Sequence, residues 1–399
     1  MRTPLPRSLV DTLPIPEGEA LAHTQACAAM LRTQINLANG WLSFARFMDL
    51  ALYAPGLGYY AAGARKFGAE GDFVTAPEIS SLFGQSLAVS IAEVLRQTGG
   101  DVLELGPGSA KLAKDILLSL DQMGVLPERY RLLEVSADLR DRQQQAVSTL
   151  PAHLVERVEW LDALPQEFTG MIVANEVLDV IPVHLVKWDA GRLFERGVAL
   201  KEDDFVWQDM PAISAELSAR TAQIHSAYLR NSPPGGYQTE VAPAVTGLVA
   251  SLAQSMKHGA MLLIDYGFRG AEFYHSQRDA GTLMCHYRHY AHPDPFVYPG
   301  LQDITAHVDF TAVAEAALLA APGLELAGYT TQANFLLASG LTDLLAQADP
   351  RDAAHYLRFA NQVQRLVSPA EMGEFFKVIG FTRGDVTISA LAKARPLPL

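Results

Sequence analysis

Glycine and acidic residues combine in the segment "LELGPGSA", which reads Glu104-x-Gly106-x-Gly108 between an apolar stretch and a helical one. Glycine allows a tight turn and close approach of a ligand, and the start of the following helix favours negative charge. A dinucleotide site follows G-x-G-x-x-G and needs glycine at position 111, where the chain has Lys111. An S-adenosylmethionine site needs an acid two residues before the first glycine, and Glu104 fits. The pattern favours S-adenosylmethionine, and the alternative is an ordinary strand–turn–helix in which glycine serves geometry alone.

Two more acids stand where the next apolar stretches end. Glu134 in "LLEVS" follows a second predicted strand, and Asp162 in "WLDAL" follows a third. Ligands of open α/β sheets bind at the carboxyl ends of the strands, where an acid after the second strand can hydrogen-bond a ribose diol. We therefore expect Glu134 at a ribose, Asp162 at an adenine amino group and Leu161 against the adenine face.

The segment "ANEVLDVIPV" ends a fourth predicted strand with Asn175, Glu176 and Asp179. Methyl transfer from a sulfonium is an in-line displacement, so an enzyme mainly positions the nucleophile and supplies electrostatics. Carboxylates can grip a guanidinium acceptor, and on a helical turn Glu176 and Asp179 would share a face. We expect these two acids to be catalytic and Asn175 to contact the cofactor. The alternative is a helix start that selects acids through its dipole.

The segment "GDFVTAPEIS" predicts the start of a helix ahead of the glycine motif. Thr75 is followed three residues later by Glu78, which is the spacing of a capping box, and Pro77 suits a first helical turn. Apolar residues at helical spacing continue to Gly99-Gly100, where we expect the helix to end. Thr75 and Pro77 are also candidates for contact with a cofactor.

A Gly- and Tyr-rich stretch over residues 52–73 leads into this helix and is longer than ordinary connections. We predict that it forms a lid over the site. In this hypothesis Asp72 and Thr75 lie near the cofactor or the acceptor, Asp72 with a catalytic role, and Tyr59 and Tyr60 wall the pocket. The N–H groups of the helix start would face the cofactor carboxylate. The alternative is a helix start and no more.

Other chemistries have weaker support in the sequence. The segment "GTLMCHYRHYAHPDP" holds Cys285 and three histidines, but their spacing matches no paired zinc pattern. We expect an aromatic and basic substrate loop there, and no metal site. A hydrolase triad is not supported, because no serine or cysteine lies in an evident nucleophile elbow.

Composition bounds the class of protein. The 399 residues carry a formal net charge of −13, which argues against nucleic acid as a partner because such binding requires neutralisation of phosphates. Two cysteines in a chain of this length form no disulfide framework and indicate a reducing compartment. The sequence shows neither an apolar run of the ~20 residues that span a membrane nor a secretory signal. We expect a bacterial cytoplasmic protein, or a mitochondrial matrix protein if the source is eukaryotic.

Strand and helix signals alternate from residue 101 onward and predict βαβ units in a parallel sheet. Residues 23–50 show helical spacing interrupted at Gly40, a hairpin is expected to turn at residues 189–191, and residues 270–305 look long and irregular. We expect an N-terminal part of residues 1–78 with arm, helices and lid. A second domain of residues 79–399 would carry insertions at about 185–240 and 270–305.

The ordered set of segments resembles the MidA-type S-adenosylmethionine-dependent methyltransferases from about Phe44 to Gly380. The resemblance is carried by "YAPGLGYY", "GDFVTAPEISSLFGQSLA", "LELGPGSAKLAKDIL", "ANEVLDVIPV", "LLIDYGF", "GTLMCHYRHY" and "DITAHVDFT". It implies the class I methyltransferase fold, a Rossmann-like α/β fold with a mostly parallel seven-stranded sheet, an added helical N-terminal region and inserted elements. It also implies that Glu104, Gly106 and Gly108 hold the cofactor, that Glu134 binds the ribose, and that residues 175–176 lie near the acceptor.

The same resemblance implies an activity. Mitochondrial members of the family are associated with assembly of respiratory complex I, and arginine methylation of a subunit is the implied reaction. The expected cofactor is S-adenosyl-L-methionine, and the expected partner is a protein acceptor such as a respiratory-complex subunit. An assembly factor that keeps the cofactor fold and docks a partner is the alternative, while Lys111 disfavours a nicotinamide oxidoreductase.

Overall fold

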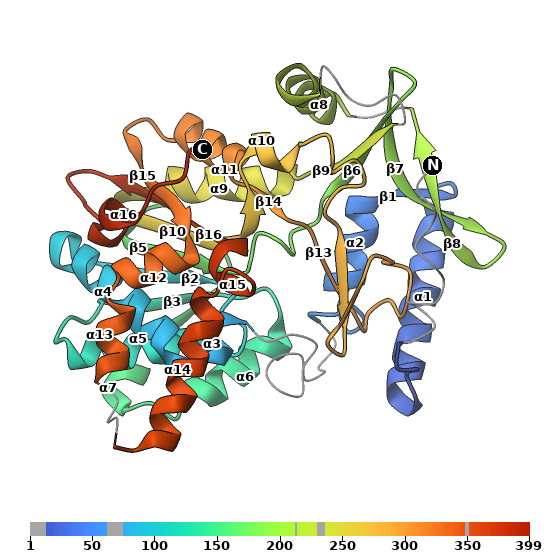
Figure 1. Cartoon of the computed structure of the whole chain (residues 1–399). Coiled ribbons are helices and arrows are strands. Elements are labelled where there is room, and N and C mark those ends of the chain that lie inside the picture. Colours follow the sequence, from blue (N-terminus) through green and yellow to red (C-terminus); the bar gives the residue numbers. More distant parts are fainter. Residues whose placement is uncertain (1–12, 62–74, 212–213, 230–235, 348–350) are drawn as a thin grey trace. The chain divides into compact units, whose positions relative to one another are not determined.

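The computed structural model describes residues 13–61, 75–211, 214–229, 236–347 and 351–399 (Figure 1). The chain divides into two compact units. The first comprises residues 1–73, 179–245 and 270–307, and the second comprises residues 74–178, 246–269 and 308–399. Whether either unit folds as an independent domain, and whether a boundary lies at residue 78, stay predictions.

The second unit is built on an eight-stranded sheet in which seven strands form one path. The path runs β15 (Leu324–Thr331), β16 (Phe376–Arg383), β10 (Met256–Phe268), β5 (Phe168–Asn175), β2 (Asp101–Leu105), β3 (Tyr130–Leu133) and β4 (Val158–Leu161), and β14 (Val308–Asp309) pairs with β10. Neighbours from β10 to β4 are parallel, whereas β16 is antiparallel to both of its neighbours. The predicted mostly parallel sheet is confirmed, and its parallel strands place their carboxyl ends at one edge.

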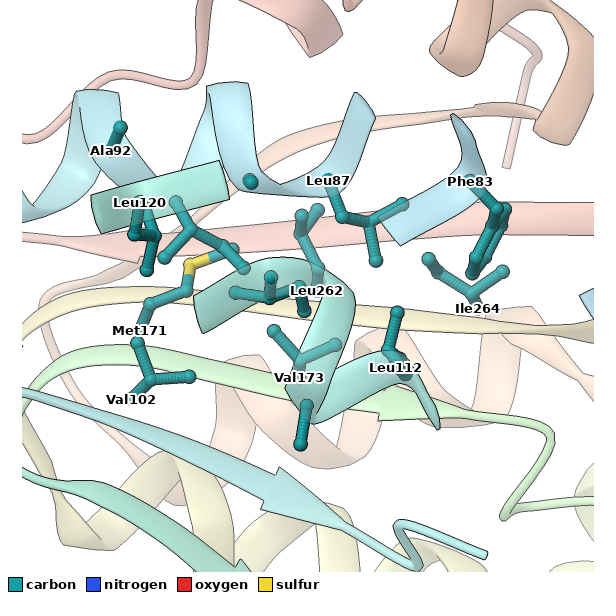
Figure 2. Close-up of a cluster of buried hydrophobic side chains, with 14 of the residues drawn as sticks. Phe83, Leu87, Ala92, Val102, Leu112, Leu120, Met171, Val173, Leu262 and Ile264 are labelled. Atoms are coloured by element: carbon teal, nitrogen blue, oxygen red, sulfur yellow. The ribbon is translucent and has the colours of Figure 1, made fainter. Parts of the chain in front are cut away.

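Helices cover both faces of this sheet. They are α3 (Ala76–Ile79), α4 (Ser81–Thr98), α5 (Lys111–Gln122), α6 (Ala137–Val147), α7 (Ala152–Val155), α9 (Pro243–Ser255, which begins in the first unit), α11 (Phe310–Ala320), α12 (Gln332–Ala338), α13 (Leu341–Ala346), α14 (Ala353–Val367), α15 (Met372–Phe375) and α16 (Ser389–Lys393). Figure 2 shows Phe83 and Leu87 of α4 and Leu112 of α5 packed over Val173 and Leu262 of the sheet. The intervening strand residues Leu103, Ile172 and Leu263 are buried as well, as a doubly covered parallel sheet requires.

The described residues of the first unit form two antiparallel sheets and the helices named below. One sheet consists of β1 (Trp41–Ser43), β6 (His184–Asp189), β7 (Arg192–Lys201), β8 (Asp204–Met210) and β9 (Tyr237–Val241), and the other of β11 (Met284–Tyr287), β12 (Tyr290–His292) and β13 (Asp303–Thr305). The helices are α1 (Gly18–Leu37), α2 (Phe44–Tyr53), α8 (Ala215–Tyr228) and α10 (Gly270–Phe273). The predicted hairpin is confirmed, because Asp189 pairs with Arg192 across Ala190 and Gly191, which both have positive φ.

The predicted break at Gly40 in the helical pattern of residues 23–50 is confirmed, because α1 ends at Leu37 and α2 begins at Phe44. The strand β1 between these helices was missed, and its Trp41 pairs with Ala199 of β7. Residues 270–305 are not irregular throughout, because β11 pairs with β12 and with β13. Strand β1 forms because it pairs with β7, which is distant in sequence, and β11 forms because it pairs with β12 across a short hairpin and with β13. The spacing of apolar residues along the chain does not predict such pairing.

In the described part of the chain, no helix has both the length and the apolar character that a bilayer span requires.

Candidate active site

The glycine motif forms the turn between β2 and α5. Gly106 and Gly108 have φ values of 55° and 53°, and Ala110 follows at 62°. A Cβ atom on Gly106 would lie 2.9 Å from Cγ2 of Val177, so this position excludes a side chain by both conformation and space. Lys111, the residue that argued against a dinucleotide site, forms an ion pair with Asp115 at 2.5 Å.

Glu104 is a buried carboxylate just before this turn. The Tyr130 hydroxyl donates to Glu104 Oε2 at 2.5 Å, and the glutamate is only 2% exposed. Burial raises the pKa of Glu104 to about 7, and the hydrogen bond from Tyr130 opposes this rise. The side chain is therefore an acid that changes charge near neutral pH, and its role at a cofactor stays a prediction.

Glu134 lies at the end of β3 and is held by two neighbours. The backbone N–H of Ser136 donates to its Oε1 at 2.8 Å, and Gln143 Nε2 donates to its Oε2 at 2.9 Å. Burial raises the pKa of Glu134, while these hydrogen bonds lower it. The donors fix the orientation of a carboxylate that can still accept from a ligand, because each oxygen has a second lone pair.

Gln143 is a buried residue of α6 whose importance the sequence reasoning missed. Its Nε2 also donates to the carbonyl of Gly108 at 3.0 Å, and its Oε1 accepts from Trp160 Nε1 at 3.0 Å. One amide thus joins the glycine turn, the predicted ribose acid Glu134 and strand β4. A glutamine in "DRQQQAV" gives no local signal of this role, because only the docking of α6 buries it.

Asp162 follows β4 and differs from the two buried acids. Its side chain is 89% exposed, and Arg140 Nη1 pairs with it at 2.8 Å. Arg140 Nη2 also donates to the carbonyls of Glu134 and Leu161, so one guanidinium joins the ends of β3 and β4. The expected contact of Asp162 with adenine stays a prediction.

Glu176 does not start a helical turn, which corrects the expectation for residues 176–179. Its φ is 55°, outside the right-handed helical region, and its N–H donates to the carbonyl of Ile264 at 2.9 Å. The Glu176 carboxylate accepts from the N–H of Ala76 and from Asn175 Nδ2, both at 3.1 Å. Residues 176–179 form bends and a turn rather than a helix, so a shared helical face is not formed.

Asn175 has one unsatisfied atom. The residue is 9% exposed at the end of β5, and its Oδ1 is buried with no hydrogen-bond partner among the described residues. Since Nδ2 donates to Glu176, the orientation of the amide is set and Oδ1 remains the acceptor. A buried acceptor without a partner is expensive in a folded protein and indicates a bound donor.

The capping box expected at Thr75 and Glu78 was wrong. Thr75 precedes the short helix α3, but its side chain caps no N–H group, and the Glu78 carboxylate accepts from the Ser109 hydroxyl of the glycine turn instead. The long helix α4 begins only at Ser81, capped by Ser80. Pro77 is buried in α3, and the contacts of Thr75 and Pro77 with a cofactor stay predictions.

Asp265 was also missed, although a signal was available. It lies near the end of β10, fully buried, and it accepts from the N–H groups of Val177, Leu178 and Tyr266. The rule that selected Glu134 and Asp162, an acid at the end of a parallel strand, applies equally to the segment "LLIDYGF".

The remaining predicted residues belong to the first unit or fall outside the described residues. Asp72 and most of the predicted lid fall outside the described residues. In the first unit, Tyr60 donates to Asp303 at 3.0 Å and stacks on Tyr53, and the backbone carbonyl of Asp179 accepts from the N–H of Ala306. Tyr59 is buried in the same unit.

The histidine-rich segment forms part of the small sheet of the first unit. Cys285 on β11 is buried and pairs in register with His292 on β12. Burial raises the pKa of the Cys285 thiol well above its ordinary value. No group of three or more His, Cys, Asp or Glu side chains in the described ranges is arranged to hold a metal ion.

The order and direction of the strands define a class I methyltransferase fold, with the glycine turn after the central strand β2 and polar residues at the ends of β3, β5 and β10. A model of S-adenosyl-L-methionine-dependent methyltransferases matches residues 86–330, and the chain belongs to this family. It is therefore an S-adenosylmethionine-dependent methyltransferase.

Similar proteins agree with this assignment. A COG1565 superfamily member from Burkholderia thailandensis, solved with S-adenosyl-homocysteine bound, is 49% identical with a TM-score of 0.90, and the match covers 96% of this chain and 98% of that one. The mitochondrial protein arginine methyltransferase NDUFAF7 homolog of Drosophila melanogaster is 29% identical over 92% of this chain and 88% of its own. The NDUFAF7 protein of Rattus norvegicus is 30% identical over 84% and 80%.

The residues at the sheet edge fit the cofactor. Glu104 and Glu134 present buried, oriented carboxylates at neighbouring strand ends, and Gly106 turns the backbone after Glu104 at a positive φ. S-adenosylmethionine carries a ribose diol and an ammonium group, which supply hydrogen-bond donors for such acceptors. When bound, it supplies an electrophilic methyl group to the site.

Proposed function

We propose that this methyltransferase acts on a protein and that the methylated group is an arginine side chain. The observation that carries the proposal is the pair at the end of β5: the unsatisfied, buried Oδ1 of Asn175 beside the oriented carboxylate of Glu176. Two adjacent acceptors, one of them charged, suit a nitrogen nucleophile that carries several N–H groups and a positive charge. The names of the NDUFAF7 relatives support the same acceptor class.

In this proposal the cofactor is held along the sheet edge. The glycine turn with Glu104 receives its amino-acid part, Glu134 accepts from the ribose, and Asp162 lies on the adenine side. Thr75, Pro77 and Asp72 would approach the cofactor or acceptor from the segment before α4. Glu134 is placed for its role by Gln143, and the glycine turn is tied to α3 by the bond between Ser109 and Glu78.

The residues of the chain then act by position and charge. Glu176 and Asn175 hold the acceptor nitrogen by its N–H groups and orient it toward the transferred methyl group, and the Glu176 carboxylate takes the proton that this nitrogen loses on methylation. The carboxylate also balances the positive charge of a guanidinium. Asp179 is a second acid for the acceptor in this proposal.

The test is transfer of tritiated methyl from S-adenosylmethionine to peptides that contain arginine, with matched peptides that carry lysine in its place. The wild type should label the arginine peptides, and Glu176→Gln should lower kcat by roughly 100-fold while binding S-adenosyl-homocysteine within a few-fold of the wild type. Labelling of lysine peptides alone would overturn the choice of arginine. Cofactor binding without labelling of any protein in a lysate would instead support a factor that acts by docking a partner.

A second part of the proposal concerns which protein is methylated and where in the cell. We propose a respiratory-complex subunit as the acceptor and the bacterial cytoplasm as the location, since a bacterial protein is 49% identical and the mitochondrial relatives are 27–30% identical. Labelled lysate resolved by mass spectrometry identifies the modified protein. A modified protein outside the respiratory complexes would overturn this part alone.

A further inference from the structure

Asp265 is the most buried acid at the edge of the sheet that carries the site. It is 0% exposed, and its Oδ2 accepts from the N–H of Leu178 at 2.8 Å and from the N–H of Val177 at 3.2 Å. Its Oδ1 accepts from the N–H of Tyr266 at 2.8 Å. Three backbone donors on a buried carboxylate are charge-assisted hydrogen bonds, which are stronger than neutral ones.

These bonds hold the backbone of residues 176–178 in a conformation that is unfavourable by itself. Glu176 has φ 55°, a left-handed conformation that is unfavourable for a residue with a side chain. Such a conformation persists only where the surroundings determine it, and here they do so on both sides of the residue. The N–H of Glu176 is bound to Ile264 of β10, and the next two N–H groups are bound to Asp265 of the same strand.

The backbone conformation of residues 176–178 has two consequences for the site. It turns the Glu176 carboxylate toward the N–H of Ala76 and the amide of Asn175. It also places the Val177 side chain against Gly106, where a Cβ would be only 2.9 Å from Val177 Cγ2. The same three residues therefore orient the proposed acceptor carboxylate and line the back of the glycine turn.

We propose that Asp265 is a positioning residue that sets both parts of the site through residues 176–178. The acceptor half of this inference rests on the proposed function, and the glycine-turn half rests on cofactor binding alone. Asp265 acts through the backbone and contacts neither substrate nor cofactor. If Asp265 loses one acceptor oxygen, the backbone of residues 176–178 is no longer held in place, so Glu176 and Val177 shift together.

The test is Asp265→Asn, which keeps the shape but turns one oxygen into an N–H donor that faces backbone N–H groups. We expect kcat to fall 10- to 100-fold, because a displacement of about 1 Å at a reacting group has that effect. The Kd for S-adenosyl-homocysteine should rise at least 5-fold. Asp309→Asn is the matched control, since Asp309 accepts from two successive N–H groups, of Thr311 and Ala312, each at 3.1 Å. It should keep both constants with little change in stability, because asparagine caps a helix about as well as aspartate and Asp309 is the N-cap of α11.

A second comparison separates positioning from stability. In the Glu176→Gln background, Asp265→Asn should lower kcat by less than 3-fold, because the group that it positions is already absent. An unchanged kcat and Kd in folded Asp265→Asn, or effects equal to those of Asp309→Asn, would overturn the inference. So would fully additive losses of kcat in the double variant.

Two further outcomes remain decisive. If Asp265→Asn does not fold, Asp265→Glu keeps the charge and shifts it by one methylene, and wild-type kcat and Kd in that variant would overturn the inference. If the wild type methylates no acceptor, the proposed function fails, and the affinity for S-adenosyl-homocysteine then decides the inference. A selective loss of this affinity in Asp265→Asn relative to Asp309→Asn supports the role of Asp265 at the glycine turn.

Discussion

Glu104 and Glu134 are buried carboxylates on neighbouring parallel strands, and their partners differ. Glu104 receives a phenol hydrogen bond from Tyr130, whereas Glu134 receives a backbone N–H and the amide of Gln143. In both cases burial raises the pKa, and hydrogen bonds to the charged form lower it. The affinity of Glu104 for a cationic donor should therefore depend on pH. The affinity of Glu134 for a hydroxyl donor should depend on how the Gln143 amide orients its carboxylate.

The first prediction concerns the pH dependence at Glu104. A cationic group of the cofactor favours the carboxylate, and below the pKa of about 7 a proton must leave before binding. The Kd for S-adenosylmethionine should be roughly tenfold lower at pH 8 than at pH 6, as measured by isothermal titration. Glu104→Gln should bind more weakly and lose most of this dependence. Equal wild-type affinities at the two pH values would remove Glu104 from the cofactor site.

The same pKa predicts a stability effect without ligand. Between pH 4.5, the ordinary pKa of a glutamate, and about pH 7, the folded protein keeps the Glu104 proton, whereas the unfolded chain has released it. The folded state therefore binds more protons in this window, and the free energy of unfolding should fall as pH rises through it. Urea unfolding between pH 5 and pH 8 measures the slope. Glu104→Gln should reduce the slope, and an unchanged slope would contradict the raised pKa.

The third prediction concerns Gln143 and Glu134. Gln143→Glu places a carboxylate against Glu134 and the Gly108 carbonyl, so the Kd for S-adenosyl-homocysteine should rise at least tenfold. Exchange of the two residues, Glu134→Gln with Gln143→Glu, restores one amide–carboxylate pair and should recover part of the loss. Trp160→Phe removes only the bond to Gln143 Oε1 and should change Kd less than threefold. Simple additivity in the double variant would refute the coupling.

At the scale of elements, the strands bring the site together at one edge of the sheet. The β2–α5 turn meets the β5–β10 edge through Gly106 and Val177, and it meets α3 through Ser109 and Glu78. Arg140 joins the ends of β3 and β4. Apart from the bond between Arg140 and Glu134, these contacts connect segments at least 21 residues apart, so the turn depends on the packing of the whole sheet edge.

The fourth prediction compares two glycines with the same backbone conformation. Gly106→Ala and Gly124→Ala each place a side chain at positive φ, 55° and 65°, but only Gly106 has an atom near the new Cβ. Gly124→Ala should cost about 1 kcal/mol of unfolding free energy and leave cofactor affinity unchanged. Gly106→Ala should destabilise further and raise the Kd for S-adenosyl-homocysteine more than tenfold. Equal effects of the two substitutions on Kd would show that Val177 does not confine the turn.

At the scale of the whole molecule, the methyltransferase sheet and the first unit each have their own core. Buried residues of the first unit, such as Phe44 and Phe47, belong to a cluster separate from that of Leu87 and Val173. A ligand that binds at the edge of the methyltransferase sheet stabilises the folded state by mass action, whatever the order in which the two cores unfold.

The fifth prediction uses this linkage. S-adenosyl-homocysteine at 100 times its Kd should raise the free energy of unfolding by about 2.7 kcal/mol, seen as a higher Tm in calorimetry. NAD at the same concentration should leave Tm unchanged, because Lys111 stands where a dinucleotide turn has glycine. Equal stabilisation by NAD would contradict the cofactor assignment.

The sequence by itself determined the alternating strands and helices, the glycine turn, the acid near the end of β2 and the acid after β3, because hydrophobic period, glycine spacing and strand-end position are local properties. It also contained the signal for Asp265, which the strand-end rule would have found. Only the tertiary structure decided that Gln143 joins three parts of the site, that Glu176 adopts a positive φ rather than a helical turn, and that Glu78 binds Ser109. These features depend on hydrogen bonds between segments 9 to 100 residues apart. No local pattern specifies which buried donor meets which acceptor once the elements have packed.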